Sequence, residues 1–318
     1  MKAVLLVGGK GTRLRPLTYR VPKPLVPVMG KPLMMHVIDS LPEEVDETIV
    51  PVGYMREAME EYLRKNPPRR KITIVEEREP MGTGGAVKNV EEYIDGPFLV
   101  INGDSISSVD MESFVRYHRS KGAFATISLW EVEDPTPFGV VDMDDNGRIR
   151  RFQEKPTKEE AFSLLINAGA YALEYEALDY IADGFVSMER EVFPRILDRG
   201  MYGLRFEGFW VDCGTRENLL KAFWTLMRGG VMDDTIQSPP VVEERAEVSK
   251  AVIGANTYVS SGVSVGEHTR IANSVIYNGA TIGRRCSITN SIVDVDVDVP
   301  DDTTIVDTIV SDADAPDE

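Results

Sequence analysis

Histidine and cysteine are scarce in this chain of 318 residues, and the scarcity of each argues against a class of site. The two cysteines, Cys213 and Cys286, lie far apart without metal-site spacing, so both are predicted to be free thiols in a reducing compartment. The three histidines, His36, His118 and His268, have no companion at ligand spacing. A zinc centre is therefore not expected.

Long apolar runs are missing too. No run reaches the length of a membrane span, and the apolar stretch before Gly8 is too short for a signal peptide. The sequence thus predicts a cytoplasmic protein with no membrane partner. The net charge of −17 also argues against nucleic acid as a partner, because its phosphates would be repelled.

Acidic residues are absent from the first 38 residues, which carry seven Lys or Arg. An apolar strand at 3–7 runs into a glycine-rich stretch at 8–16, and a Pro-Lys-Pro motif centred on Lys23 follows. Glycines let the backbone approach an anion and aim its N–H groups at it, while Arg13 and Lys23 add full charges. The stretch therefore predicts a polyphosphate site. The alternative is an ordinary strand-to-helix turn with a few solvated bases.

Two common phosphate loops do not fit this stretch. The Walker A pattern needs Gly-Lys followed by Ser or Thr, which does not occur here. The dinucleotide pattern could begin at Gly9, but Leu14 stands where its third glycine belongs. On so acidic a chain, an anionic substrate is expected to need both this basic stretch and a divalent cation.

Residues 1 to about 230 alternate apolar strands with helical stretches. This pattern predicts an α/β fold with a Rossmann-like, mainly parallel sheet. Asn146-Gly147 between two short strands predicts a hairpin, since Gln153 stands where a calcium loop needs a bidentate Glu. The predicted strands are 2–7, 47–52, 71–75, 97–102, 124–130, 138–143, 166–173 and 204–209. The predicted helices are 31–40, 55–65, 84–93, 110–120, 158–163, 175–182, 189–198 and 215–227.

The pattern changes after residue 230. Apolar residues recur every six positions at Ile253, Val259, Val265 and Ile271, and a 17-residue repeat begins at Ile271. This period predicts a left-handed parallel β-helix; a small antiparallel sandwich would need no fixed period. The predicted domains are the α/β domain at 1–232, a linker at 233–247, the β-helix at 248–310 and an acidic tail at 311–318.

Basic residues are absent from Cys286 to the end, where Asp294, Asp296 and Asp298 alternate with valines. The spacing favours a solvated acidic face that protects the open edge of the last coil. A metal site is the alternative.

Two other carboxylates are predicted magnesium ligands. Asp104 follows the apolar strand at 97–102, and Asp212 follows another apolar strand and precedes a helix. Open α/β sheets bind ligands at the carboxyl ends of their strands, and the Mg²⁺ that accompanies a triphosphate takes one or two carboxylates. Helix capping is the alternative role. Lys155, which precedes a proline, is expected to be extended and to reach a phosphate.

Nine motifs occur in the order found in sugar nucleotidyltransferases, and the chain resembles the GDP-mannose pyrophosphorylases most. The resemblance spans almost all of residues 1–310, including the hexapeptide tail. The motifs are Gly-Gly-x-Gly-Thr-Arg-Leu-Arg-Pro-Leu-Thr, Pro-Lys-Pro-Leu-Val-Pro, Gly-Thr-Gly-Gly at 82–85, Asn-Gly-Asp, Phe-Gly-Val-Val, Glu-Lys-Pro, Asn-Ala-Gly, Glu-Arg-Glu-Val-Phe-Pro and Phe-Trp-Val-Asp-Cys-Gly.

The resemblance implies transfer of a nucleotidyl group from a nucleoside triphosphate to a sugar 1-phosphate, with Mg²⁺ as cofactor and a homo-oligomer formed through the β-helix. It implies catalytic roles for Arg13, Lys23 and Lys155. The implied nucleotide-binding residues are Leu6, Gly8, Gly9, Gly11, Thr12, Arg13, Lys23, Glu77, Gly82, Thr83 and Asp104. The implied sugar-phosphate-binding residues are Gly139, Glu154, Lys155, Asn167 and Asp212, and the implied metal ligands are Asp104 and Asp212.

Glu77 bears on the identity of the base. Relatives that use thymidine or uridine triphosphate commonly carry Gln at the comparable position. Guanine offers two donors, N1–H and the 2-amino group, which a carboxylate can accept together, so Glu77 favours GTP. The alternative is an exposed Glu in the acidic run of Glu76, Glu77 and Glu79.

Three other functions stay open at this point. The first is a glucose-1-phosphate thymidylyl- or uridylyltransferase. The second is a non-catalytic regulatory subunit that binds a nucleotide sugar, although such relatives tend to lose the charged residues kept here. The third is an acyltransferase built on the β-helix, for which His268 is the one candidate base.

Overall fold

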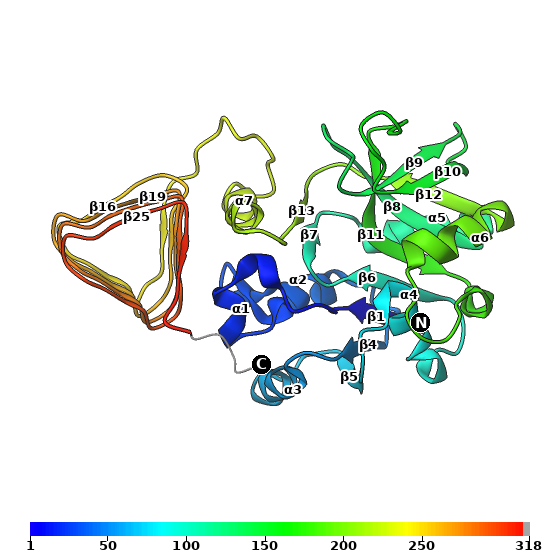
Figure 1. Cartoon of the computed structure of the whole chain (residues 1–318), viewed down its shortest axis with the longest axis horizontal. Helices are drawn as coiled ribbons and strands as arrows, with labels where there is room; N and C mark the ends of the chain where they lie inside the picture. Colours follow the sequence, from blue (N-terminus) through cyan, green and yellow to red (C-terminus); the bar gives the residue numbers. More distant parts are fainter. Residues whose placement is uncertain (314–318) are drawn as a thin grey trace. The chain divides into compact units, whose positions relative to one another are not determined.

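The structure is a computed structural model that describes residues 1–313 (Figure 1). It divides into two compact units. Unit 1 comprises Met1–Gly9 and Met34–Trp210, and unit 2 comprises Lys10–Leu33 and the chain from Val211 onward. The domain limits at 1–232, 233–247 and 248–310 stay predictions, and residues 314–318 of the predicted acidic tail lie outside the described part. No helix within residues 1–313 is long and apolar enough to cross a membrane.

Unit 1 is built on a nine-stranded sheet in which β10, β9, β11, β6, β1, β4 and β5 are neighbours in that order, and β8 joins β11 to β12. The sheet is parallel from β6 through β1 and β4 to β5, as predicted. Strand β11 is antiparallel to β6, β8 and β9, which makes the sheet mixed. The strands are β1 Lys2–Leu6, β4 Glu47–Val52, β5 Lys71–Glu76, β6 Phe98–Asn102, β8 Ala125–Glu131, β9 Gly139–Met143, β10 Ile149–Glu154, β11 Leu165–Leu173 and β12 Met201–Arg205, with the short β7 at Ser105–Ser107.

The central strands are apolar along their whole length. Residues 98–101 of β6 and residues 3–6 of β1 are all buried. Strands covered on both faces show such continuous apolar runs, which explains why the sequence predicts them well. The helices of unit 1 are α2 Leu33–Ser40, α3 Arg56–Lys65, α4 Gly82–Lys88, α5 Met111–Lys121 and α6 Phe193–Ile196; tighter or wider turns lie at Glu91–Tyr93, Tyr175–Tyr180, Met188–Val192 and Leu197–Arg199.

Two predicted elements of this unit are wrong or misplaced. Residues 158–163 form no helix: Glu160 and Ala161 donate to the carbonyl of Thr157 in a single turn that does not continue. The segment is largely exposed, so it has little of the tertiary packing that stabilises a short helix. The strand predicted at 204–209 begins earlier, at Met201. It passes through Gly203, where a Cβ would clash with the buried side chain of Leu129, which accounts for a glycine at this position.

Unit 2 carries a parallel β-helix with three sheets, seen end-on as a triangle in Figure 1. Ile271, Ile288 and Ile305 are paired in register and buried, so the 17-residue repeat is one coil, as predicted. The sheets are β14-β17-β20-β23-β26, β15-β18-β21-β24 and β16-β19-β22-β25. Their strands are Val241–Val242, Glu247–Val248, Val252–Ile253, Tyr258–Val259, Ser264–Val265, Arg270–Ala272, Val275–Ile276, Thr281–Ile282, Ser287–Thr289, Ile292–Val293, Asp298–Val299, Thr304–Val306 and Ile309–Val310, numbered β14 to β26 in chain order.

One corner of each coil is turned by an Asn or Asp in the left-handed conformation. Asn256, Asn273, Asn290 and Asp307 have φ between 50° and 53°. Short polar side chains tolerate this conformation better than other non-glycine residues. The side chain of Asn256 donates to Asn273, and that of Asn290 donates to Asp307. The Asn and Asp of the repeat therefore fix both the corner and the stacking of adjacent coils.

The rest of unit 2 includes the basic stretch of the sequence. Its elements are short turns at Thr12–Leu14 and Lys23–Leu25, α1 Leu17–Arg20, the strands β2 Pro27–Val28 and β3 Lys31–Pro32, and α7 Arg216–Met227. Strand β13, Trp210–Asp212, leads into α7. Thr215 caps α7 by accepting from the N–H of Asn218, and the helix matches the predicted 215–227.

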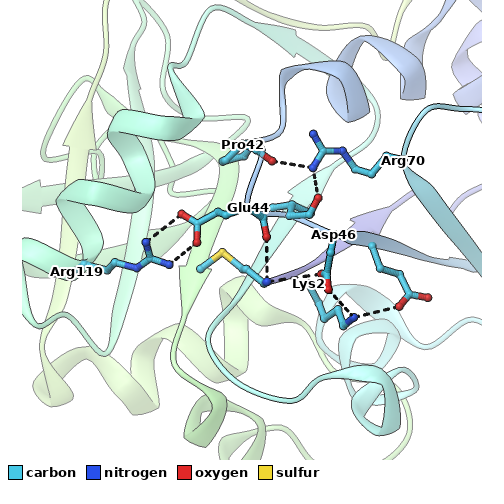
Figure 2. A network of polar contacts seen from close by, with 9 residues as sticks. Lys2, Pro42, Glu44, Asp46, Arg70 and Arg119 are labelled. Atoms are coloured by element: carbon cyan, nitrogen blue, oxygen red, sulfur yellow. Dashed lines mark hydrogen bonds and ion pairs between the residues drawn. The ribbon is translucent and has the colours of Figure 1, made fainter.

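A polar network in unit 1 fastens the chain start and the loop before β4 (Figure 2). The amino group of Met1 donates to the carbonyl of Glu44, whose carboxylate pairs with Arg119 on α5. Arg70 donates to backbone carbonyls of residues 41, 42 and 45. Lys2 pairs with both Asp46 and Glu47. These contacts fix the end of the sheet at which β1 and β4 begin.

Glu47 is the buried member of this network. Its carboxylate pairs with Lys71 at 2.8 Å and Lys2 at 3.2 Å and accepts from Thr73 at 2.5 Å. The hydrogen bond from Lys71, followed by that from Thr73, lowers the pKa of Glu47 from its ordinary 4.5 to about 2. A lowered pKa in the folded state means stability that is present above pH 4.5 and lost as the pH falls through 2.

We therefore expect Glu47→Gln to destabilise the protein at pH 7 and to matter less below pH 3. The loss at pH 7 should be about 1 kcal/mol, since the partner Lys71 is largely exposed and solvent screens the pair. Urea unfolding of both proteins between pH 2 and pH 7 measures the difference. The exposed Glu92→Gln is the control, and a loss that is constant across this range would contradict the assignment.

Candidate active site

The carboxyl ends of β1 and β6 open into a pocket of about 350 Å³ within unit 1. Seven of the residues predicted to bind nucleotide line it together: Leu6, Gly8, Gly9, Glu77, Gly82, Thr83 and Asp104. Pro80, Ala86, Asn102 and Phe185 complete the lining and carry no role in the sequence prediction. Gly9 has φ of 110°, which side chains rarely adopt, and a Cβ there would meet nothing within 4 Å. Its glycine therefore serves the backbone conformation and leaves the pocket mouth open.

Asp104 is placed by the end of β6. The strand ends at Asn102, and the N–H of Gly103 donates to the carbonyl of Leu6 at 2.7 Å, which ties the turn to the end of β1. A Cβ on Gly103 would lie 2.8 Å from Val7, so only glycine lets the two strand ends lie this close. Asp104 follows directly and lines the pocket, at the sheet edge where the sequence predicts it.

Glu77 is fixed by its own backbone neighbours. It is half-buried, whereas Glu76 and Glu79 are exposed. Its Oε1 accepts from the N–H of Met81 at 3.0 Å, and its own N–H donates to the carbonyl of Val52. The three glutamates are thus not equivalent, which weakens the alternative of a uniformly solvated acidic run.

A second group in unit 1 holds the predicted sugar-contacting residues. A Cβ on Gly139 would lie 2.9 Å from Oε2 of Glu154, so the two face each other across the β9–β10 hairpin. The hairpin itself turns at Asn146-Gly147, as predicted. On β11, Asn167 donates to the hydroxyl of Tyr171 at 2.9 Å.

Glu189 connects this group to the pocket, and the sequence prediction missed it. One of its oxygens accepts from Thr83 at 2.7 Å and from Ser187 at 2.8 Å. The other accepts from Tyr171 at 3.3 Å. The signal was present, because Glu189 opens the Glu-Arg-Glu-Val-Phe-Pro motif, but the motif alone does not say which of its two glutamates faces inward.

Burial and a neighbouring carboxylate both shift the pKa of Glu154. Burial, and after it the neighbouring Glu189, raises the pKa of Glu154 above its ordinary value. Burial also raises the pKa of Tyr171 well above its ordinary value, so its hydroxyl stays a donor. Perturbed groups of this kind gather at functional sites.

The prediction for the backbone of Lys155 is wrong. Its φ is 48°, in the left-handed region, where an extended residue was expected. Its N–H donates to the carbonyl of Phe138, which continues the hairpin ladder before the chain turns into Pro156. Its Nζ lies 3.8 Å from Glu154. A non-glycine residue held in this conformation is one kind of strain that clusters at functional sites.

Unit 2 gathers the basic residues of the predicted phosphate site. Nζ of Lys23 lies 3.9 Å from Oδ1 of Asp212. A Cβ on Gly214 would lie 2.7 Å from Nη2 of Arg13 and 2.9 Å from Oδ1 of Asp212, so both side chains lie over this glycine. Gly11, with φ of 61°, starts the turn Thr12–Leu14 that carries Arg13. Arg13, Lys23 and Asp212 thus form one cluster, which we call the Gly214 cluster.

Comparison with known proteins identifies the family. Residues 2–228 match the family described as "Nucleotidyl transferase", and residues 236–315 match the one described as "GMPPB C-terminal domain". The chain belongs to the nucleotidyl transferase family. Such nucleotidyltransferases typically use a divalent metal ion.

Curated relatives of this nucleotidyl transferase differ in the nucleotide they are named for. A probable mannose-1-phosphate guanylyltransferase of Oryza sativa subsp. japonica is 42% identical over 223 residues, which are 67% of this chain and 61% of that protein. A UTP–glucose-1-phosphate uridylyltransferase of Synechocystis sp. is 35% identical over 297 residues, 85% of this chain and 75% of that protein. The match to the rice protein thus spans less than two thirds of its length.

Solved structures agree with the α/β fold. HddC from Yersinia pseudotuberculosis is similar with a TM-score of 0.59 and 32% identity, covering 71% of this chain and all but 1% of that one. A putative glucose-1-phosphate thymidylyltransferase from Bacillus anthracis has a TM-score of 0.64 at 25% identity, covering 70% of this chain and 94% of that one.

Because the raised pKa of Glu154 is a cost to folding, Glu154→Gln should stabilise this nucleotidyl transferase at pH 8. A folded state that binds the proton more tightly than the unfolded chain loses stability as the pH rises through the raised pKa. The variant should be the more stable protein at pH 8, and this gain should vanish near pH 4, below the ordinary pKa of a Glu. Urea unfolding at both pH values measures it.

Glu160→Gln is the matched control for this comparison. The hydrogen bond from the backbone of Thr157 lowers the pKa of Glu160, so this variant should gain nothing at pH 8. A Glu154→Gln variant that is equally stable to wild type at pH 8 would show that Glu154 carries no such cost.

Proposed function

We propose that this chain is a Mg²⁺-dependent mannose-1-phosphate guanylyltransferase that forms GDP-mannose and pyrophosphate from GTP and mannose 1-phosphate. The observation that carries the proposal is the pocket of unit 1, in which open glycine backbone, Asp104 and Glu77 converge. Phe185, which is 72% exposed, adds an aromatic ring on which a base can stack. A phosphate-binding backbone, a stacking ring and a fixed carboxylate are the parts that a purine nucleotide needs.

The proposed reaction needs charge neutralisation and alignment more than proton transfer. A phosphate oxygen of the sugar 1-phosphate attacks the α-phosphorus of the triphosphate in line, the bond from that phosphorus to the bridging oxygen breaks, and pyrophosphate leaves. The attacking oxygen is already anionic at neutral pH, so no general base is required. Arg13 and Lys23 would neutralise the triphosphate, and Lys155 would hold the sugar phosphate.

Magnesium fits the residues proposed to hold it. Asp104 and Asp212, the metal ligands predicted from the sequence, would each offer carboxylate oxygens, the hard ligands that Mg²⁺ prefers. Within residues 1–313 no group of three or more His, Cys, Asp or Glu forms a metal cage. A Mg²⁺ that takes most of its ligands from phosphates and water needs only one or two carboxylates, so the donor set suits it. When bound, the ion would neutralise charge on the phosphates.

The choice of GTP is supported by the geometry of Glu77. The N–H of Met81 occupies Oε1, and a carboxylate has further lone pairs that can accept from the two guanine donors. The mannose assignment is supported by names of relatives that include mannose-1-phosphate guanylyltransferases of rice and Xenopus laevis. The uridylyltransferase of Synechocystis supports the runner-up, a thymidylyl- or uridylyltransferase acting on glucose 1-phosphate.

The proposal includes the homo-oligomer expected from the sequence, with a flat side of the β-helix as its contact surface. Val252 on β16 and Val306 on β25, at the two edges of one sheet, are 58% and 52% exposed.

The direct experiment is a panel of nucleoside triphosphates, GTP, ATP, CTP, UTP and dTTP, each with mannose or glucose 1-phosphate. We expect GDP-mannose and pyrophosphate to form fastest from GTP and mannose 1-phosphate in the presence of Mg²⁺, and EDTA to stop turnover. Product chromatography and a pyrophosphate assay measure both. Fastest turnover of UTP or dTTP with glucose 1-phosphate would establish the runner-up, and no turnover of any pair would favour a regulatory subunit.

Glu77→Gln tests the base. The N–H of Met81 will hold the amide oxygen, so the amide NH₂ must face the guanine donors. A donor facing a donor should cost about 1–3 kcal/mol for GTP, whereas uracil and thymine can now accept from the amide. The preference for GTP over UTP should therefore narrow by roughly ten- to a hundredfold in kcat/KM. Glu79→Gln, on an exposed neighbour, is the control, and an unchanged ratio would remove Glu77 from base recognition.

A further inference from the structure

The basic segment, residues 10–33, has little structure of its own. Its helical elements between Thr12 and Leu25 are each three or four residues long. Elements this short are not stable alone, because helix formation begins with an unfavourable nucleus. The position of Lys23 must therefore come from contacts made by the rest of unit 2.

The first such contact lies three residues before Lys23. At the end of α1, Nη1 of Arg20 donates to the carbonyl of Val295 at 2.7 Å, and its Nε lies 3.9 Å from the carboxylate of Asp294. Asp294 was predicted to belong to a solvated face, and this is wrong: it is 1% exposed. Ser311 and the N–H of Val295 donate to its two oxygens, which hold the carboxylate toward Arg20. Asp298, on the neighbouring strand β24, is exposed as predicted.

The second contact lies four residues after Lys23. The hydroxyl of Tyr277 donates to the carbonyl of Pro27 at 2.8 Å. Tyr277 is 1% exposed, and burial raises its pKa well above the ordinary value, so the donor proton is retained at any assay pH. The N–H of Val26 in turn donates to the carbonyl of Lys23. Both flanks of Lys23 are thus tied to coils of the β-helix.

The same coils hold the helix that follows Asp212. The ring of Phe223 on α7 lies 5.1 Å from that of Tyr258 and 6.2 Å from that of Tyr277, centroid to centroid. Nε1 of Trp224 donates to the carbonyl of Asn256 at 2.9 Å. Tyr277 therefore contacts both chain segments that meet in the Gly214 cluster.

We propose that the β-helix holds the backbone of the Gly214 cluster in place, a role that we call the bracket. Arg20, Asp294 and Tyr277 are then positioning residues for Lys23. This inference rests on the proposed function for its kinetic consequence only. A Lys23 whose backbone is loosened should bind the triphosphate less well, because ordering the segment then has to accompany binding. The sugar phosphate, which Lys155 is proposed to hold, should be bound as before.

Hydrogen exchange of the full chain without substrate tests the bracket itself. In Arg20→Gln and in Tyr277→Phe we expect the amides of residues 17–28 to exchange about tenfold faster, the effect of losing one hydrogen bond. Arg20→Lys should recover part of the protection, since it keeps a charge and a donor. Arg20 is exposed and Asp294 is buried, so Arg20→Gln removes the contact without disturbing the buried carboxylate.

A matched Arg–Asp pair elsewhere on the β-helix serves as control. Arg285 and Asp302 form an exposed pair between adjacent coils. Arg285→Gln and Asp302→Asn should leave exchange in residues 17–28 unchanged. Unchanged exchange in both Arg20→Gln and Tyr277→Phe would overturn the bracket, as would equal acceleration in the controls.

Steady-state kinetics tests the consequence. Arg20→Gln and Tyr277→Phe should raise KM for the triphosphate about three- to tenfold and leave KM for the sugar 1-phosphate within twofold. The double variant should have a higher KM for the triphosphate than either single variant. A rise in both KM values, or a rise of the same size in Arg285→Gln, would overturn a positioning role. If wild type turns over no substrate pair, the proposed function fails, while hydrogen exchange still decides whether the bracket exists.

Discussion

The rest of this structure depends on one constraint: an acidic chain must hold positive charge locally, where its proposed anionic substrates bind. The chain carries a net charge of −17, yet its proposed substrates are two phosphate anions. Long-range attraction cannot help such substrates, so binding has to come from charges and backbone dipoles held in place at short range. The acid-free first 38 residues supply those charges, and Gly214 lets Arg13 and Asp212 lie over the same backbone position. The cluster is compact because its one carboxylate offsets part of the repulsion between two cations.

The sugar-side group of unit 1 solves the opposite problem. Glu154 and Glu189 lie near each other, and burial, followed by the neighbouring Glu189, disfavours the charged form of Glu154. Glu189 accepts three hydrogen bonds, from Thr83, Ser187 and Tyr171. The raised pKa of Glu154 is a cost to folding, as expected of a residue proposed to contact the sugar rather than to stabilise the fold. Glu189 would thus organise the site, whereas Glu154 would contact the ligand.

Much of the fold could be predicted from the sequence, because it depends on burial that repeats along the chain. The wrong or missing predictions concern residues whose contacts come from distant parts of the sequence. Continuous apolar strands such as β1 and β6, and the 17-residue period of the β-helix, follow from burial that repeats regularly along the chain. Lys155 and Asp294 were misjudged because their surroundings come from distant residues, Phe138 in one case and Arg20 with Ser311 in the other. Glu189 was missed for the same reason. Its partners Thr83 and Tyr171 lie 106 and 18 positions away in sequence.

The β-helix gives the chain stiffness that the basic segment lacks. Every coil pairs in register with the next through three sheets, so moving one corner requires breaking hydrogen bonds on several strands. A helix of three or four residues has no comparable resistance. Tyr277 joins the two: its ring packs against Phe223 of α7, and its hydroxyl holds the backbone at Pro27. One buried side chain therefore contacts both α7 and the segment that carries Lys23. The β-helix thus stabilises the basic segment, whose own elements are too short to be stable alone.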